Sequence, residues 1–178
     1  MDLKFWTRKY WSDIWYWLGS SPYLVRRLVS LADISGADTI VELGAGYGQV
    51  TEYLIQYKSK NTKLIVVEDD PERVVELKRK YGQYCEVHEV SAAHINEIVD
   101  LNSIDIIIST LPLGSISDEW VDHILRSSQS VLVTGGRFVQ YQYALQNLGD
   151  VRRYFDVTRI VYELRNFWPA FIYQANKK

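Results

Sequence analysis

Three closely spaced glycines follow a short apolar segment early in the chain, and they constrain the fold more than any other feature of the sequence. The segment TIVEL (39–43) is typical of a buried strand, glycines stand at 44, 46 and 48, and residues 50–57 carry a helical pattern. Glycines in such a turn let the backbone approach a ligand closely and direct free N–H groups towards it. The sequence therefore predicts a strand, a ligand-binding loop and a helix in succession.

Strand and helix patterns alternate along the rest of the chain. Apolar or alternating runs predict strands at 39–43, 63–68, 84–90, 103–110, 135–144, 157–164 and 170–175. Helical patterns occupy 50–57, 71–82, 92–100 and 116–132, whereas residues 146–150 are expected to form a loop. The last two strands have no helix between them, and their connection RNFWP suits a hairpin. This order indicates an α/β fold with a doubly wound sheet and a reversed edge strand.

The chain has the size of one domain with an N-terminal extension. Its 178 residues can bury one full core but are short for two. We expect a helical extension over 1–35, with helices at 7–18 and 22–32, and a single domain over 36–178. Cys85 is the only cysteine and the histidines show no ligand spacing, so no disulfide and no metal site are expected.

A glycine triplet alone does not identify its ligand, because nicotinamide and flavin enzymes also use one. Here the spacing is G-x-G-x-G, and Gln49 stands where the dinucleotide pattern needs its third glycine. An acid, Glu42, precedes the first glycine by two positions. A dehydrogenase would also need further residues outside its nucleotide-binding domain to bind the substrate, and this chain has few such residues.

With Glu68 at the end of the second strand, the loop resembles that of the class I S-adenosylmethionine-dependent methyltransferases. The resemblance covers about residues 36–175 and implies a seven-stranded, mostly parallel sheet with an antiparallel C-terminal hairpin and strand order 3-2-1-4-5-7-6. It implies S-adenosylmethionine as cofactor and S-adenosylhomocysteine as product. In the family, the acid matching Glu68 accepts hydrogen bonds from both ribose hydroxyls. The positions implied to contact the cofactor are Glu42, Gly44, Ala45, Gly46, Glu68, Asp69, Ser91, Ala92 and Ser109.

Two of these positions have a second interpretation or depart from the family. Ser91 stands where many members carry an aspartate that contacts the adenine amino group, and serine can still hydrogen-bond there. Asp69 and its neighbour Asp70 also suit the start of the following helix, where aspartate is a favoured cap.

The loop STLPLG (109–114) lies where a methyl acceptor would meet the cofactor. Nucleic-acid adenine methyltransferases have Asn or Asp, then Pro, then an aromatic ring at this site, to hold the amine and stack on a flipped base. Thr110 and Leu113 replace the polar and aromatic positions. The net charge of −2 provides no broad basic surface either, so a nucleic-acid acceptor is disfavoured.

STLPL instead resembles a loop of the bacterial phospholipid N-methyltransferases, which methylate phosphatidylethanolamine. GGRFVQYQY and RNFWPAFIY are similar to that family's fifth and closing strands, with Thr110 in place of a glycine and Trp168 in place of a proline. The resemblance implies a lipid acceptor held by Thr110, Leu111, Pro112 and Leu113.

Tyr141 and Tyr143 are candidates for the acceptor site, although neither is an evident general base. They alternate with glutamines on the fifth strand, so both rings face the same side. At the mouth of the site they would stabilise a methylated ammonium by cation–π attraction. Alternatively, they pack under a helix.

An aromatic segment precedes the enzyme-like part of the chain. FWTRKYWSDIWYWL (5–18) holds four of the six tryptophans together with Arg8 and Lys9. Such residues favour the surface of an anionic membrane, so we expect a lid that also contacts lipid, in a cytoplasmic enzyme peripheral on the inner membrane face. The residues concerned are Trp6, Tyr10, Trp11, Trp15 and Trp17. Completion of the core or a dimer interface is the alternative.

Two other functions stay open from the sequence. One is methylation of a soluble small molecule, a protein or rRNA. The other is a non-catalytic cofactor-binding module, suggested by the departures at Ser91 and Thr110.

Overall fold

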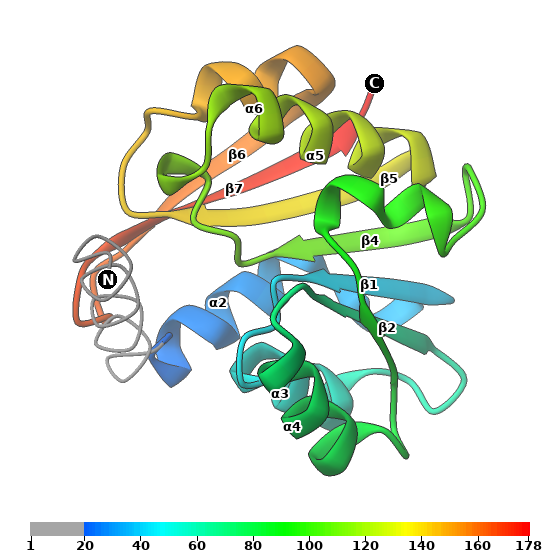
Figure 1. Ribbon diagram of the computed structural model, residues 1–178. Helices are drawn as coiled ribbons and strands as arrows, with labels where there is room; N and C mark the ends of the chain where they lie inside the picture. Colours follow the sequence, from blue (N-terminus) through cyan, green and yellow to red (C-terminus); the bar gives the residue numbers. More distant parts are fainter. Residues whose placement is uncertain (1–19) are drawn as a thin grey trace, which may run out of the picture.

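A seven-stranded sheet forms the centre of the protein in the computed structural model, which describes residues 20–178 (Figure 1). The strands are β1 (Thr39–Leu43), β2 (Lys63–Glu68), β3 (Glu86–Glu89), β4 (Ile104–Ser109), β5 (Leu132–Gln142), β6 (Phe155–Glu163) and β7 (Ala170–Lys177). Their order is β3-β2-β1-β4-β5-β7-β6, as predicted. The first five strands are parallel, and β7 pairs antiparallel with both β5 and β6. The predicted C-terminal hairpin is therefore confirmed.

Helices cover both faces of this sheet. They are α2 (Pro22–Ala32), α3 (Gln49–Tyr57), α4 (Pro71–Tyr81), α5 (Asp118–Val131) and α6 (Leu148–Tyr154), with 3-10 turns at Ile34–Gly36, Ala92–Glu97 and Leu113–Ser115. Figure 1 shows α2, α3 and α4 on one face and α5 and α6 on the other. None of the helices in the described part of the chain combines the length and hydropathy needed to cross a membrane.

The central strands are buried on both faces because each face has its own hydrophobic core. One core contains the apolar side of α2 together with Leu54 of α3 and Ile108 of β4. The other core packs α5 against residues such as Ile107 and Phe138. Strand β4 lies centrally in the sheet, because it pairs with β1 on one side and β5 on the other, and its side chains enter both cores.

Two expectations about the segment around β5 were wrong. Residues 146–150 were expected to form a loop, but α6 begins at Leu148 and buries Val151 against the α5 side of the sheet. Its seven residues are too few for a clear helical period, and Gly149 lies within them. Strand β5 also begins at Leu132, directly after α5, rather than at 135.

The carboxyl ends of the parallel strands lie at one edge of the sheet, where doubly wound folds bind their ligands. The glycine loop follows β1 there, the loop from Thr110 follows β4, and Tyr143 follows β5. Residues Trp6, Tyr10, Trp11, Trp15 and Trp17, expected to form a lid or membrane contact, lie outside the described residues.

Candidate cofactor and acceptor site

The glycine loop is held against the end of β2 by backbone hydrogen bonds. Gly44 N–H and Ala45 N–H both donate to the Val67 carbonyl, at 2.9 and 3.3 Å. Gly44 has a φ of +75°, in the left-handed region that side chains with a Cβ rarely adopt. A Cβ at this position would also lie 2.5 Å from Leu111 Cδ2. The backbone conformation therefore favours glycine at this position, and a Cβ would also displace the Leu111 side chain of the loop after β4.

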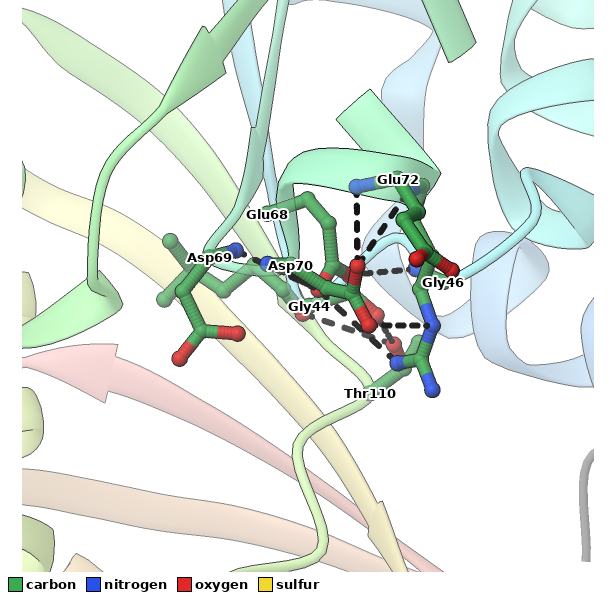
Figure 2. Close-up of polar contacts among 9 residues, drawn as sticks. Gly44, Gly46, Glu68, Asp69, Asp70, Glu72 and Thr110 are labelled. Carbon is green, nitrogen blue, oxygen red and sulfur yellow. Dashed lines mark hydrogen bonds and ion pairs between the residues drawn. The ribbon is translucent and has the colours of Figure 1, made fainter. Parts of the chain in front are cut away.

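Glu68 anchors the other side of the loop. Its side chain is 4% exposed and accepts a 2.7 Å hydrogen bond from Gly46 N–H (Figure 2). The backbone N–H groups of Asp69 and Asp70 also donate to it, each at 3.2 Å. Burial raises the pKa of Glu68 above its usual range, although the hydrogen bond from Gly46 opposes that shift. A buried carboxylate surrounded by donors is suited to bind further donors such as hydroxyl groups.

The two aspartates after Glu68 have different positions. Asp70 caps α4, since its Oδ1 accepts hydrogen bonds from Glu72 N–H at 2.9 Å and Arg73 N–H at 3.3 Å. Asp69 instead lines a cavity beside Glu68. The capping interpretation therefore holds for Asp70 only.

A cavity of about 350 Å³ opens beside the glycine loop, a volume within the range of roughly 300–1,000 Å³ typical of small-molecule sites. Its walls include five of the nine predicted cofactor positions, namely Gly44, Glu68, Asp69, Ser91 and Ala92. Sequence reasoning missed the apolar part of the wall, formed by Val67, Val90, Ile116, Trp120 and Ile124. Trp120 is 47% exposed in the first turn of α5, and a tryptophan directly after the acidic residues that begin this helix was the available signal.

Glu42 and Ser109 lie behind the cavity rather than in its wall. Both are fully buried, and neither Glu42 Oε1 nor Ser109 Oγ has a hydrogen-bond partner. Thr51 Oγ1 donates to the other carboxyl oxygen of Glu42 at 2.6 Å. Burial raises the pKa of Glu42 to about 8, so this carboxyl group is mostly protonated at neutral pH.

The loop after β4 is fastened to the glycine loop. Thr110 N–H donates to the Leu43 carbonyl at 3.0 Å, and Thr110 Oγ1 donates to the Gly44 carbonyl at 2.5 Å (Figure 2). The side chain that departs from the glycine of similar lipid methyltransferases thus joins the two loops.

Two glutamines of β5 hold the next residue of the same loop. Gln140 Nε2 and Gln142 Nε2 each donate to the Leu111 carbonyl, both at 2.8 Å. Gln140 is fully buried and Gln142 is 7% exposed, so water does not compete effectively for these bonds. The position of Leu111 is consequently fixed from β1 and from β5.

A second cavity, of about 190 Å³, lies on the other side of Leu111. Thr110, Leu111 and Pro112 line it, together with Tyr141 and Tyr143. Leu113, the fourth residue expected to contact the acceptor, is fully buried in the core facing α5 and does not line the cavity. Leu111 lines both cavities, so it separates the two places where reactants would bind.

The two tyrosines form one aromatic corner of the second cavity. Their ring centroids are 5.8 Å apart and the ring planes meet at 76°. Tyr141 OH accepts a 3.1 Å hydrogen bond from Ser20 Oγ. Burial raises the pKa of both hydroxyl groups above their usual range, so neither is an effective base at neutral pH.

The residues around the larger cavity fit S-adenosylmethionine. The glycine loop brings backbone close to the cavity, Glu68 offers a buried acceptor for ribose hydroxyls, and the apolar wall suits a purine ring. In residues 20–178, no group of three or more His, Cys, Asp or Glu side chains is placed to hold a metal ion. The strand order and this loop define a class I S-adenosylmethionine-dependent methyltransferase.

Comparisons with known proteins place the chain in this class. It belongs to the methyltransferase domain family, whose model matches residues 40–136. It is 30% identical to the ornithine lipid N-methyltransferase of Singulisphaera acidiphila, over 86% of this chain and 83% of that protein. It is 31% identical to a probable ribosomal RNA small subunit methyltransferase A of Methanosarcina acetivorans, but spans only 51% of that protein.

The fold is also that of a solved methyltransferase. The N-methyltransferase NodS of Bradyrhizobium japonicum, in complex with S-adenosylhomocysteine, superposes with a TM-score of 0.72 at 13% identity, covering 91% of each chain. At that identity the likeness shows the shared fold.

Replacing Trp120 with alanine is expected to weaken S-adenosylhomocysteine binding about tenfold, because an aromatic contact contributes on the order of 1 kcal/mol beyond the area that it buries. Titration calorimetry measures the change. Tyr84→Ala, which removes a ring that is 53% exposed away from the cavity, is the matched control and should bind normally. Equal affinity of the two variants would contradict a role for Trp120 in the cofactor site.

Proposed function

We propose that this methyltransferase transfers methyl groups to the amine of a membrane lipid head group, with phosphatidylethanolamine as the expected acceptor. One observation carries the proposal: the described residues that line the second cavity have no charged side chain, and two of them are tyrosines. A neutral aromatic site suits an amine that becomes a methylated ammonium, because ring faces attract such cations. The 30% identity to an ornithine lipid N-methyltransferase supports a lipid acceptor.

The arrangement supports methyl transfer by alignment. When bound, S-adenosylmethionine would supply an electrophilic methyl group on its sulfonium, which an uncharged amine could attack in line while the neutral thioether S-adenosylhomocysteine leaves. The protein itself fixes Leu111, which lies between the two sites. Gly44 contacts the Leu111 side chain, and Gln140 and Gln142 donate hydrogen bonds to its carbonyl. Holding two reactants in such a geometry is a large part of catalysis for a displacement that needs little activation. The neutral tyrosines orient the amine and exclude water.

Methylation of rRNA is the second candidate, favoured by the similarity to the archaeal rRNA methyltransferase. It needs a polar group and an aromatic ring in the loop after β4. Thr110 already donates its hydroxyl to Gly44, and Leu113 is buried in the core. This loop therefore supports the lipid acceptor better than a flipped base. The non-catalytic module was suggested by two residues that depart from the family, Ser91 and Thr110. Thr110 joins the two loops through its hydrogen bond to Gly44, and Ser91 lines the cofactor cavity, so both residues have a structural role and the reason for proposing such a module is removed.

One assay tests the acceptor. Purified protein is incubated with S-adenosylmethionine labelled on its methyl group and, separately, with vesicles containing phosphatidylethanolamine, vesicles containing ornithine lipid, phosphoethanolamine, or small-subunit rRNA. Label in the extracted lipid is expected. Label in rRNA or in the soluble amine, with none in either lipid, would refute the proposal.

A further inference from the structure

The loop between β6 and β7 reverses the usual placement of polar and apolar side chains. Its apolar residues face solvent, since Leu164 is 66%, Phe167 63% and Trp168 50% exposed. Two polar residues at this turn, Glu163 at the end of β6 and Asn166 in the loop, are turned inward and are only 4% and 9% exposed, whereas the Arg165 side chain between them is exposed. Large apolar side chains grouped on one surface loop commonly mark an interaction site.

Hydrogen bonds of the buried polar residues hold this loop in shape. Glu163 accepts hydrogen bonds from Arg165 N–H and Nε, both at 2.9 Å, and from its terminal nitrogen at 3.0 Å. Hydrogen bonding to Arg165 lowers the pKa of Glu163 to about 2, so the pair stays charged. Asn166 Nδ2 donates to the Trp168 carbonyl at 2.9 Å, and Asn166 Oδ1 accepts from Ser21 N–H at 2.8 Å. These hydrogen bonds therefore hold the loop in a conformation that exposes its apolar side chains.

Basic and aromatic residues of α2 extend the same surface. The Arg165 guanidinium lies over the ring of Tyr23, 4.9 Å from its centroid, and that ring is 51% exposed. Arg26 and Arg27 are exposed on the following turn of α2. Arg27 lies close enough to Glu163 to help lower the pKa of that carboxyl group. Exposed apolar side chains beside three arginines match the chemistry of an anionic lipid surface.

This surface adjoins the acceptor cavity. Gln142 at the end of β5 pairs with Phe171 at the start of β7. The β6–β7 loop therefore lies beside the end of β5, where Tyr141 and Tyr143 are found. Asn166 of the loop also lies close enough to the Tyr143 side chain, which lines the cavity, to influence the pKa of its hydroxyl group. In Figure 1 the β6–β7 turn lies at the same end of the sheet as the carboxyl end of β4.

We propose that Tyr23, Leu164, Arg165, Phe167 and Trp168, here called the hairpin surface, dock the enzyme on an anionic membrane so that the acceptor cavity opens towards the lipid head groups. This inference rests on the proposed function, since a soluble acceptor would need no such docking. Leu164 and Phe167 enter the interface, and the arginines contact anionic head groups.

The test compares two double variants of the full chain that add the same charge. Leu164→Asp/Phe167→Asp changes the hairpin surface, and Val75→Asp/Leu101→Asp changes side chains that are 67% and 62% exposed elsewhere. Co-sedimentation with vesicles of phosphatidylethanolamine and phosphatidylglycerol is measured. Since acidic residues are strongly disfavoured at the interface, the first variant is expected to bind at least about tenfold more weakly, and the control less than about twofold. S-adenosylhomocysteine binding should be unchanged in both.

The outcomes separate this inference from the proposed function. Equal vesicle binding by both variants, or no vesicle binding by the unaltered protein, overturns the hairpin surface. Selective loss of vesicle binding by the first variant supports the hairpin surface. If the unaltered protein binds vesicles but transfers no labelled methyl group to lipid, only the lipid acceptor is refuted. If the first variant loses S-adenosylhomocysteine binding, Phe167→Ser and a matched control, Leu101→Ser, replace the two double variants in the same measurement. A dimer that only the hairpin substitutions dissociate, with vesicle binding intact, would assign the surface to a second copy and overturn the proposal.

Discussion

Replacing Glu68 with alanine is expected to weaken the binding of S-adenosylhomocysteine by at least about a hundredfold, which titration calorimetry would measure directly. Hydrogen bonds to a charged group contribute roughly 1.5–3 kcal/mol each, and two ribose hydroxyls would lose their acceptor. The substitution also removes the acceptor of the 2.7 Å bond from Gly46 N–H, so the glycine loop loses one of its anchors. Both effects act in the same direction.

A nearby acid provides the control for this substitution. Glu72 lies four residues later in the first turn of α4 and does not line the cavity, so Glu72→Ala should bind the ligand normally. Glu68→Gln keeps one acceptor oxygen in place of two and loses the charge, so its affinity should fall between those of the alanine variant and the native protein. Binding within about threefold of the native protein in Glu68→Ala, with circular dichroism unchanged, would show that the ribose does not depend on this residue.

Replacing Glu42 with glutamine is expected to abolish a pH dependence of stability that the native protein shows between about pH 4.5 and 8. Burial raises the folded-state pKa of Glu42 from 4.5 to about 8. Because the folded state then binds a proton that the unfolded state has released, stability decreases as pH rises through this window. The decrease approaches 1.4 kcal/mol per pH unit, on the order of 4 kcal/mol in all. The glutamine side chain cannot ionise and carries no such loss.

Chemical denaturation at pH 5 and pH 8 measures the effect as a difference between the two proteins, so other titrating groups cancel. Glu42→Gln should be close to the native protein at pH 5 and clearly more stable at pH 8. Glu52→Gln, which changes an exposed acid in the first turn of α3, should follow the native protein at both values. Parallel curves for Glu42→Gln and the native protein would mean that the folded protein ionises Glu42 as readily as the unfolded chain does.

Much of the fold follows from local patterns in the sequence. Apolar runs such as 103–110 are long and uniform enough to identify buried strands, and the helix-free connection between the last two strands identifies the hairpin. Helix α6 was missed because a seven-residue helix that contains Gly149 has little periodicity of its own. Its stability comes from Val151 in the core, which is a tertiary contact.

The site divides in the same way. Gly44 and Glu68 belong to one local motif, so the sequence predicts their place in the cofactor cavity. Trp120 joins that cavity only because α5 packs beside the 3-10 turn Ala92–Glu97, which no local pattern indicates. Leu113 has the loop position of an acceptor residue, but the 3-10 turn that begins with it directs its side chain into the core.

Leu111 has a consequence for how enzymes of this shape can diversify. Its side chain closes one cavity, forms a wall of the other and touches Gly44, while its carbonyl is held by two amides. A smaller side chain at this position would enlarge the second cavity for a new acceptor, but it would also change the wall of the cofactor cavity. On the proposed function, a change of acceptor that leaves donor affinity intact is therefore expected first at Pro112 or Tyr143, which line the second cavity and not the first.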